Sequence, residues 1–207
     1  MIFVENQEVW GFEHAIRGMR NPLNSWSKSD SHADDSGEFV VGEKDLALMK
    51  HLCGAGTEQR KFLRQIFVSM DITAPLYWWK EFDTYKVGTV SNSCSTMHTL
   101  HKRDLDIDDF SVESLGYDQN KVMLDLIQTL NALRNIYVDT GDKRYWRMMI
   151  QLLPESFNQR RTITMNYENV LSMIKQRKNH RLSEWRAFCK DLSDLPYVRD
   201  LIATRNS

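Results

Sequence analysis

The chain has 207 residues, of which 42% are hydrophobic and 27% are charged, and its formal net charge at pH 7 is −1. This length is sufficient for one globular domain with a full hydrophobic core, and the composition is ordinary for a soluble protein. The near-neutral charge argues against a broad electrostatic surface for nucleic acid or membrane, so neither is expected as a partner.

The cysteines and the hydropathy pattern predict the compartment. Cys53, Cys94 and Cys189 are widely separated and form no Cys-x-x-Cys pair, which favours reduced thiols and argues against structural zinc. No apolar stretch at the N-terminus suits a signal peptide, and no run approaches the ~20 apolar residues that cross a bilayer. We therefore expect a cytoplasmic protein with no metal site.

The first part of the chain predicts a strand, two helices and a long loop. Residues 1–10 (MIFVENQEVW) are typical of a strand, and residues 11–21 of a short helix. A polar, turn-rich surface loop is expected over residues 21–37, and long loops in compact domains are often functional. Helical spacing over residues 43–52 ends at Gly54-Ala55-Gly56.

The next segment predicts a strand that leads into a helix. Residues 65–73 (QIFVSMDIT) alternate apolar and polar side chains, which indicates a half-buried strand. Pro75 suits the first turn of a helix, because its missing N–H costs no hydrogen bond there. We expect that helix to run through WWKEFDTYK and to end near Gly88. The apolar positions of the strand are Ile66, Val68, Met70 and Ile72.

Helices dominate the second half of the chain. They are predicted over residues 121–138, 142–153 and 168–177, with two short ones over LSEWRAFCKDL and PYVRDLIAT, whereas RRTITMNY is β-rich. The fold class is therefore α+β, with a helix-rich C-terminal half. The longest helix is predicted to bury one face, made of Val122, Leu126, Leu130, Leu133 and Tyr137.

Two stretches follow a known pattern. Residues 74–97, APLYWWKEFDTYKVGTVSNSCSTM, align without a gap to APIFVxRQWxRHRxxSxNExSxRY. Residues 153–177, LPESFNQRRTITMNYENVLSMIKQR, align to LPxxxYxxxxWTxNxRSLxNFLxLR. In these two stretches the chain resembles the flavin-dependent thymidylate synthases, the ThyX family. The residues that match are Ala74, Pro75, Leu153, Pro154, Thr164, Asn166 and Arg177.

The resemblance implies a single ThyX-like domain over residues 1–207, with a small antiparallel sheet flanked by helices. It implies the family reaction, which converts dUMP to dTMP using methylenetetrahydrofolate, FAD and NADPH. In that reaction reduced flavin, and not a protein nucleophile, carries the chemistry. The expected cofactor is therefore FAD, with NADPH and folate as co-substrates. The expected partners are a nucleotide and further copies of the chain in a homotetramer.

The resemblance assigns binding residues and no catalytic residue. The flavin positions include the family's Arg-His-Arg signature, which here reads Thr84-Tyr85-Lys86. The remaining flavin positions are Asn92, Asn166, Ser172 and Arg177. The nucleotide positions are Glu81, Cys94, Thr96 and Arg177.

Several of these positions depart from the family's chemistry. Thr84 and Tyr85 are neutral, Thr96 stands where the family has an arginine, and Glu81 is an anion where the family has glutamine. Each charge-assisted bond to phosphate contributes ~1.5–3 kcal/mol, so their loss weakens phosphate binding unless other arginines substitute. The alternative function is a catalytically lapsed or repurposed nucleotide- or flavin-binding homologue. The arginines that are candidates for substitution are Arg144, Arg147, Arg160 and Arg161.

Three features also have a purely structural interpretation. Asn166 can cap the helix that follows it, and Arg177 can be a solvated charge at that helix's end. Cys94, with His98 four residues on, can be a nucleophile, although a pocket-shaping role is favoured. Tyr77-Trp78-Trp79 can stack on a flavin, although a helix core and a subunit interface are favoured.

Overall fold

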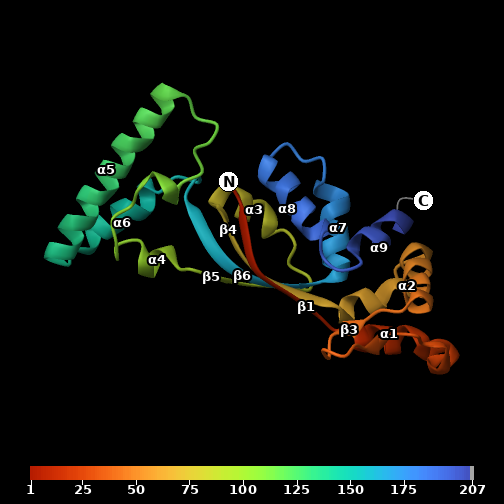
Figure 1. The fold of residues 1–207 in the computed structure, drawn as a ribbon. Helices are drawn as coiled ribbons and strands as arrows, with labels where there is room; N and C mark the ends of the chain where they lie inside the picture. Colours follow the sequence, from red (N-terminus) through yellow and green to blue (C-terminus); the bar gives the residue numbers. More distant parts are fainter. Residues whose placement is uncertain (206–207) are drawn as a thin grey trace. The chain divides into compact units, whose positions relative to one another are not determined.

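The computed structural model describes residues 1–205 and contains the mixed helices and strands that the sequence predicts (Figure 1). The strands are β1 (Phe3–Trp10), β2 (His32–Ala33), β3 (Phe39–Val40), β4 (Phe67–Pro75), β5 (Thr89–Ser93) and β6 (Asn158–Asn166). The α-helices are α1 (Phe12–Arg20), α2 (Glu43–Ala55), α3 (Leu76–Phe82), α4 (Thr96–Thr99), α5 (Tyr117–Thr140), α6 (Lys143–Leu152), α7 (Tyr167–Arg177), α8 (Ser183–Ser193) and α9 (Val198–Arg205). The 3-10 turns are η1 (Asn21–Leu23), η2 (Trp26–Lys28), η3 (Gln59–Gln65) and η4 (Ile107–Asp109).

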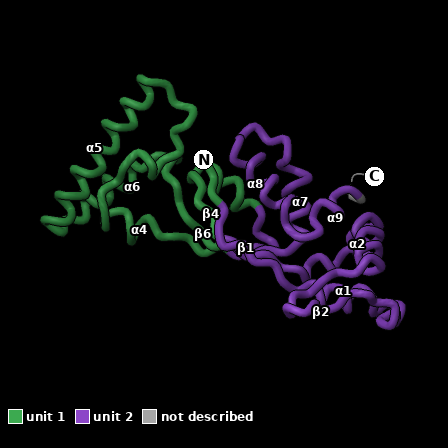
Figure 2. Tube along the Cα trace, in the orientation of Figure 1, with its two compact units in different colours: residues 1–3, 71–84, 91–162 green, residues 4–70, 85–90, 163–207 purple. Residues whose placement is uncertain are grey.

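The chain divides into two compact units, which Figure 2 draws in different colours. Unit 1 comprises residues 1–3, 71–84 and 91–162, and unit 2 comprises residues 4–70, 85–90 and 163–207. The strands β1, β4, β5 and β6 each contribute residues to both units. Within residues 1–205, no helix has the length and apolar character needed to span a membrane.

The main sheet has the strand order β1-β4-β6-β5. The N–H of Tyr167 donates to the carbonyl of Ile66 at 2.9 Å, and the N–H of Leu76 donates to the carbonyl of Phe157 at 3.0 Å. Residue numbers therefore rise along β4 as they fall along β6, so the two strands are antiparallel. The predicted alternation is confirmed, because the inward side chains are at most 1% exposed; they are Ile66, Val68, Met70 and Ile72.

Strand β5 lies at an edge of the sheet, and the sequence did not indicate it. Its residues, TVSNS, are small and polar, and most of them are exposed. Directly after it, the N–H of Cys94 donates to the carbonyl of Arg160 at 2.9 Å. The segment lacks the alternation of a half-buried strand, so pairing with β6 and not local sequence makes it a strand.

Helix α3 is shorter than predicted, and its aromatic side chains are buried within the chain. It ends at Phe82, and Thr84 then folds back, since its hydroxyl donates to the carbonyl of Glu81 at 2.7 Å. Trp78, Trp79 and Phe82 are at most 1% exposed. The interpretation as packed core is confirmed for Trp78 and Trp79, whereas Tyr77 is half-buried. Because the single chain already covers these rings, their burial is no indication of a subunit interface.

Helices α5 and α6 pack against each other in unit 1 and enclose a separate apolar cluster. The predicted face of α5 is correct at four positions, which pack on or within this cluster: Leu126, Leu130, Leu133 and Tyr137. Val122 was predicted wrongly, because it is 69% exposed, whereas its neighbour Met123 is 8% exposed. The buried stripe begins one residue later than predicted and follows Met123, Ile127 and Leu130 at helical spacing.

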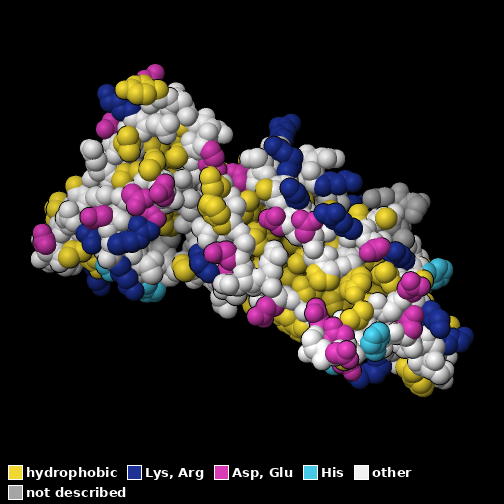
Figure 3. Space-filling view, in the orientation of Figure 1, with side chains coloured by type: hydrophobic (Ala, Val, Ile, Leu, Met, Phe, Trp, Pro, Cys, Tyr) yellow, Lys and Arg dark blue, Asp and Glu magenta, His cyan; other side chains and the backbone are white. Residues whose placement is uncertain are grey.

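Unit 2 is built around α1, α2, η3 and the C-terminal helices. Helix α1 packs on η3, and α7 packs on α8 and η3. The fully buried side chains of this core include Ala15, Met49, Leu63, Trp185 and Phe188. Lysine and arginine side chains gather over α7 and α8 on the face drawn in Figure 3, whereas acidic and basic groups are interspersed over much of the rest.

Substitution of Leu130 tests the corrected face of α5. Leu130 is 0% exposed and Val122 is 69% exposed. We expect Leu130→Ala to lower the free energy of unfolding by roughly 2–5 kcal/mol, because it leaves a cavity in a packed cluster. Val122→Ala is the matched control and should change it by less than about 0.5 kcal/mol. Denaturant unfolding measures both free energies. Equal losses of stability in the two variants would show that Val122 is buried and that the corrected face of α5 is wrong.

Candidate functional site

Unit 2 contains a cavity of about 1080 Å³ between α1, α2 and η3. Its volume lies slightly above the usual range for ligand pockets, which is roughly 300–1,000 Å³. Met19, Leu48, Leu52 and Phe62 give it an apolar surface. The remaining lining residues are Gly18, Arg20, Asn21, Pro22, Leu23, Asn24, Ser25, Ser27, Lys28, Lys44, Glu58, Gln59, Lys61, Arg64 and Gln65. We call it the basic cavity.

The charges around the basic cavity are mostly positive. Lys28, Lys44, Lys61 and Arg64 line it together with one acidic residue, Glu58. These four cationic side chains are exposed, and within residues 1–205 none of them makes a hydrogen bond or an ion pair. Exposed cations beside an apolar surface suit a ligand that combines an anionic group with an aromatic ring.

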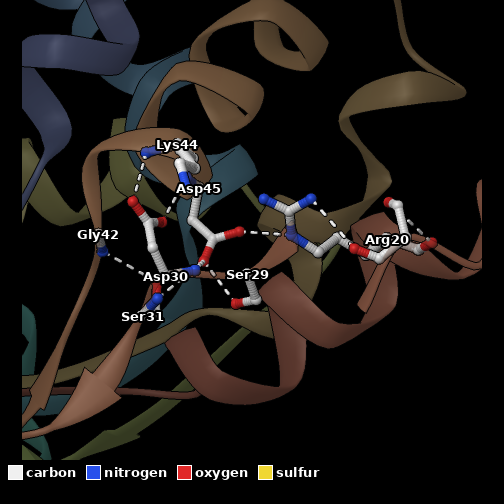
Figure 4. A network of polar contacts seen from close by, with 8 residues as sticks. Arg20, Ser29, Asp30, Ser31, Gly42, Lys44 and Asp45 are labelled. Atoms are coloured by element: carbon white, nitrogen blue, oxygen red, sulfur yellow. Dashed lines mark hydrogen bonds and ion pairs between the residues drawn. The ribbon is translucent and has the colours of Figure 1, made fainter. Parts of the chain in front are cut away.

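A fifth cation of the cavity, Arg20, is engaged in a buried ion pair. Its Nε donates to Oδ1 of Asp45 at 2.6 Å, and the two side chains are 5% and 0% exposed (Figure 4). Oδ2 of Asp45 accepts four further hydrogen bonds, from the Ser29 and Ser31 hydroxyls and from the N–H groups of Asp30 and Ser31. Burial raises the pKa of Asp45, but the hydrogen bonds from Ser29, Ser31 and Arg20 outweigh it and hold that pKa at about 2.

Asp30 forms a second anchor beside this pair. Its carboxylate accepts from the N–H of Lys44 at 2.9 Å and from the N–H of Asp45 at 3.1 Å, so it caps the start of α2 (Figure 4). A side chain at Gly42 would place a Cβ 2.3 Å from Asp30, so glycine is required for this approach. Most residues of the segment 21–37 are exposed, and the segment contains η1, η2 and β2 and is fixed to α2.

The α7 candidates Ser172 and Arg177 lie together with Tyr85. Nε of Arg177 donates to the Tyr85 hydroxyl at 2.9 Å, and that hydroxyl donates to Gln176 at 2.9 Å. Gln176 in turn donates to the Ser172 hydroxyl at 3.1 Å. The Arg177 guanidinium also lies 5.0 Å from the ring centre of Trp185. The structure therefore unites three of the candidate flavin residues and binds them to one another.

Asn166 caps α7, as its structural interpretation predicts. Its side chain accepts from the N–H of Asn169 at 3.1 Å, and the residue is 8% exposed. Gly88 lies against it with φ +75°, and a Cβ there would come within 2.6 Å of the Asn166 amide. Lys86, in the same segment, is exposed and makes no hydrogen bond or ion pair within residues 1–205.

The other candidates belong to unit 1. Thr84 is bonded to the carbonyl of Glu81, Asn92 and Cys94 are exposed at β5, and Thr96 is the first residue of α4. The Cys94 carbonyl accepts from the side chain of Gln159 at 2.9 Å. The structure thus divides the predicted site residues between the two units.

Three of the four arginines considered as substitutes are already paired. Arg160 lies 2.8 Å from Asp71, Arg161 lies 2.8 Å from Asp83, and Arg144 lies 2.6 Å from Asp142. Arg161 also stacks on Trp79, 4.2 Å from its ring centre. The remaining arginine, Arg147, is exposed on α6. The cations that the sequence interpretation missed are those of the basic cavity, which are scattered over residues 28–64 without a motif.

The residues of the basic cavity fit a flavin or another phosphorylated aromatic group. Lysine and arginine can neutralise phosphates, and Leu48, Leu52 and Phe62 can contact a ring. The signature positions fit it less well, since Thr84 is bonded to its own helix and Tyr85 is bonded to Arg177. Within residues 1–205, no group of three or more His, Cys, Asp or Glu side chains is arranged to hold a metal ion.

The chain has the fold of the flavin-dependent thymidylate synthases. ThyX from Helicobacter pylori complexed with FAD and dUMP aligns with a TM-score of 0.68 and 17% identity over 96% of each chain. A second structure of that protein with FAD and dUMP gives 0.71 and 16% over all of both chains. The UMP/dUMP methylase PolB from Streptomyces cacaoi, bound with 5-Br dUMP, gives 0.63 and 13% over 98% of this chain and 95% of PolB. No protein-family model and no curated protein matches the sequence.

These similarities confirm the fold that the two sequence patterns predict. The α+β class, the small antiparallel sheet and the ThyX-like arrangement of elements are all observed. At 13–17% identity the similarity concerns the fold, so function is argued from the residues of the site.

Acid unfolding tests the buried pair. Folding lowers the pKa of Asp45 from 3.8 to about 2, so its stabilisation is complete above pH ~4 and is lost as the pH falls towards 2. We expect Asp45→Asn to be less stable at pH 7 and to lack about 2 kcal/mol of the acid-induced loss that the unaltered chain shows. Urea unfolding between pH 2 and 7 measures both. If the free energy of unfolding falls by the same amount in both chains between pH 7 and pH 2, the lowered pKa of Asp45 is contradicted.

Proposed function

We propose that this chain binds a nucleotide and FAD on the thymidylate synthase fold, and that the basic cavity holds an anionic part of one of them. The observation that carries the proposal is a set of four exposed cations around an apolar surface that have no side-chain partner within residues 1–205: Lys28, Lys44, Lys61 and Arg64. The related structures contain FAD with dUMP, or 5-Br dUMP, which supports the same ligand classes here.

The proposed reaction is the methylation of dUMP to dTMP with methylenetetrahydrofolate and NADPH. A bound flavin would supply the redox chemistry. The chain's own residues would bind and orient the ligands: the lysines neutralise phosphate charge, and Phe62 with the leucines of α2 excludes water from one side of a ring. Tyr85 and Arg177 would shape the surface beside α7, where their side chains are bonded to each other.

A second candidate function is a nucleotide- or flavin-binding homologue that has lost the reaction. The observation that favours it is the fixed state of the motif region. Arg160 and Arg161 are bound to aspartates, and the Thr84 hydroxyl is bound to Glu81. Arg160 and Arg161 are therefore not available to a dianionic phosphate, and Lys86 is the one cation that the signature itself contains.

A cytoplasmic homotetramer is part of both versions of the proposal, and light scattering of the purified chain tests the assembly.

Paired lysine variants identify which region holds the cofactor. Lys61 lines the basic cavity, whereas Lys86 belongs to the signature region, and both are exposed. We expect Lys61→Gln to weaken FAD binding about tenfold or more, because one charge-assisted bond is worth roughly 1.5–3 kcal/mol. Lys86→Gln should leave the affinity within about twofold. Flavin fluorescence titration measures both, and the reverse order of effects would place the phosphate at the signature.

Growth of a thymidine auxotroph separates the two candidate functions. The family's signature arginines are absent here, and neutral hydrogen bonds replace charge-assisted ones only in part. We therefore expect the unaltered chain to rescue growth poorly, even when it binds FAD in the titration. Rescue to a normal growth rate would exclude the lapsed homologue. If Lys61→Gln then abolished that rescue, the reaction would depend on the basic cavity.

A further inference from the structure

One short segment, residues 24–31, forms part of two cavities. Ser25, Ser27 and Lys28 line the basic cavity. Trp26, Ser29 and Ser31 line a smaller cavity of about 470 Å³. Because residues of the same segment contribute to both cavities, a shift of its backbone would alter both.

Contacts close to the segment are few: backbone hydrogen bonds of Lys28 and Ser29 close the turn η2, and Nε1 of Trp26 donates to Oδ1 of Asn21 at 2.8 Å. The segment contains only the three-residue turn η2, and most of its side chains are exposed. Its hydrogen bonds to other elements lead mainly to Arg20 and to Gly42–Asp45 at the start of α2. Asp45 alone accepts four hydrogen bonds from it, and the same carboxylate holds the Arg20 guanidinium (Figure 4).

The contacts of Asp45 also determine which positive charges are available to a ligand in the basic cavity. The Arg20 charge is neutralised by Asp45, although Arg20 lines both cavities. Among the described residues 1–205, no side chain pairs with Lys28, carried by the fixed segment, or with Lys44, on the first turn of α2. The carboxylate therefore places cations for a ligand while its own charge is neutralised by Arg20.

We propose that Asp45 is a positioning residue for the anionic ligand of the basic cavity, acting through the segment that carries Ser25, Ser27 and Lys28. This rests on the proposed nucleotide or flavin binding. Asp45 does not contact the ligand; it holds the cavity wall in the binding geometry before the ligand arrives. Ordering a loop on binding weakens affinity, and an ordered wall removes that cost.

Asp45→Asn and Asp71→Asn form a matched pair of variants. The first substitution keeps the side-chain shape but removes the charge and one acceptor oxygen. Asp71 accepts from Arg160 and Thr162 in unit 1, so its loss also removes a charged hydrogen-bond acceptor, and Asp71 lines neither cavity. The two variants therefore separate a local effect on the cavity wall from a general loss of stability.

Two measurements are made on each chain. Limited trypsin digestion with mass spectrometry gives the rate of cleavage after Lys28, which reports release of the segment. Titrations with FAD and with inorganic pyrophosphate give affinities for the proposed cofactor and for the cations alone. We expect Asp45→Asn to raise cleavage after Lys28 about tenfold or more and to weaken both ligands by about tenfold. Asp71→Asn should change neither by more than about twofold.

If Asp45→Asn does not fold, Gly42→Ala replaces it. This variant keeps Asp45 but forces Asp30 away from a Cβ that would lie 2.3 Å from it. The same rise in cleavage and the same loss of affinity are expected.

The outcomes distinguish the two proposals. Unchanged pyrophosphate affinity in a variant with rapid cleavage after Lys28 would overturn the positioning role, as would equal effects of Asp71→Asn. If the unaltered chain binds pyrophosphate but not FAD, the proposed flavin function is overturned. The positioning role is then tested by comparing the pyrophosphate affinities of the unaltered chain, Asp45→Asn and Asp71→Asn. Binding of neither ligand would overturn both.

Discussion

A carboxylate that water cannot reach must find its hydrogen-bond donors inside the protein. Asp45 is 0% exposed and has five such bonds, from one guanidinium, two hydroxyls and two backbone amides. Each donor comes from residues 20–31, so satisfying one charge dictates the path of a whole segment. The same segment supplies Asp30, which caps α2 and lies so close to Gly42 that position 42 requires glycine, and it supplies Ser25, Ser27 and Lys28 to the wall of the basic cavity.

The motif region illustrates the opposite use of charge. There the arginines sit opposite aspartates on neighbouring strands or helices, as in the pairs of Arg160 with Asp71 and Arg161 with Asp83. These pairs are partly exposed, so each contributes little to stability, but they occupy the guanidinium groups. The Tyr85 hydroxyl likewise accepts a hydrogen bond from the Arg177 guanidinium and so occupies it. A cation already bonded to a protein group must break that bond before it can bind phosphate.

The sequence predicted those parts of the fold that have a strong local pattern. The alternation of Ile66, Val68, Met70 and Ile72 identified β4, and Pro154 correctly marked the end of α6. Strand β5 and the fixed segment before α2 could not be predicted this way, because pairing with β6 and bonding to Asp45 are contacts between distant residues. The predicted burial of Val122 was wrong by one position. Adjacent residues of a helix point about 100° apart, so a shift of one residue moves a side chain from core to solvent.

The site shows a similar division between pattern and contact. Register with the family selected Tyr85, Ser172 and Arg177, and the structure places these three side chains close together. The register did not indicate that they would be bonded to one another, nor that Lys28, Lys44, Lys61 and Arg64 would meet around one cavity. Residues so widely spaced have no motif, and only the packing of η2, α2 and η3 around the cavity unites them. Under the proposed function, the fold would offer positive charge to a ligand from positions that no sequence pattern marks, in place of a recognisable signature.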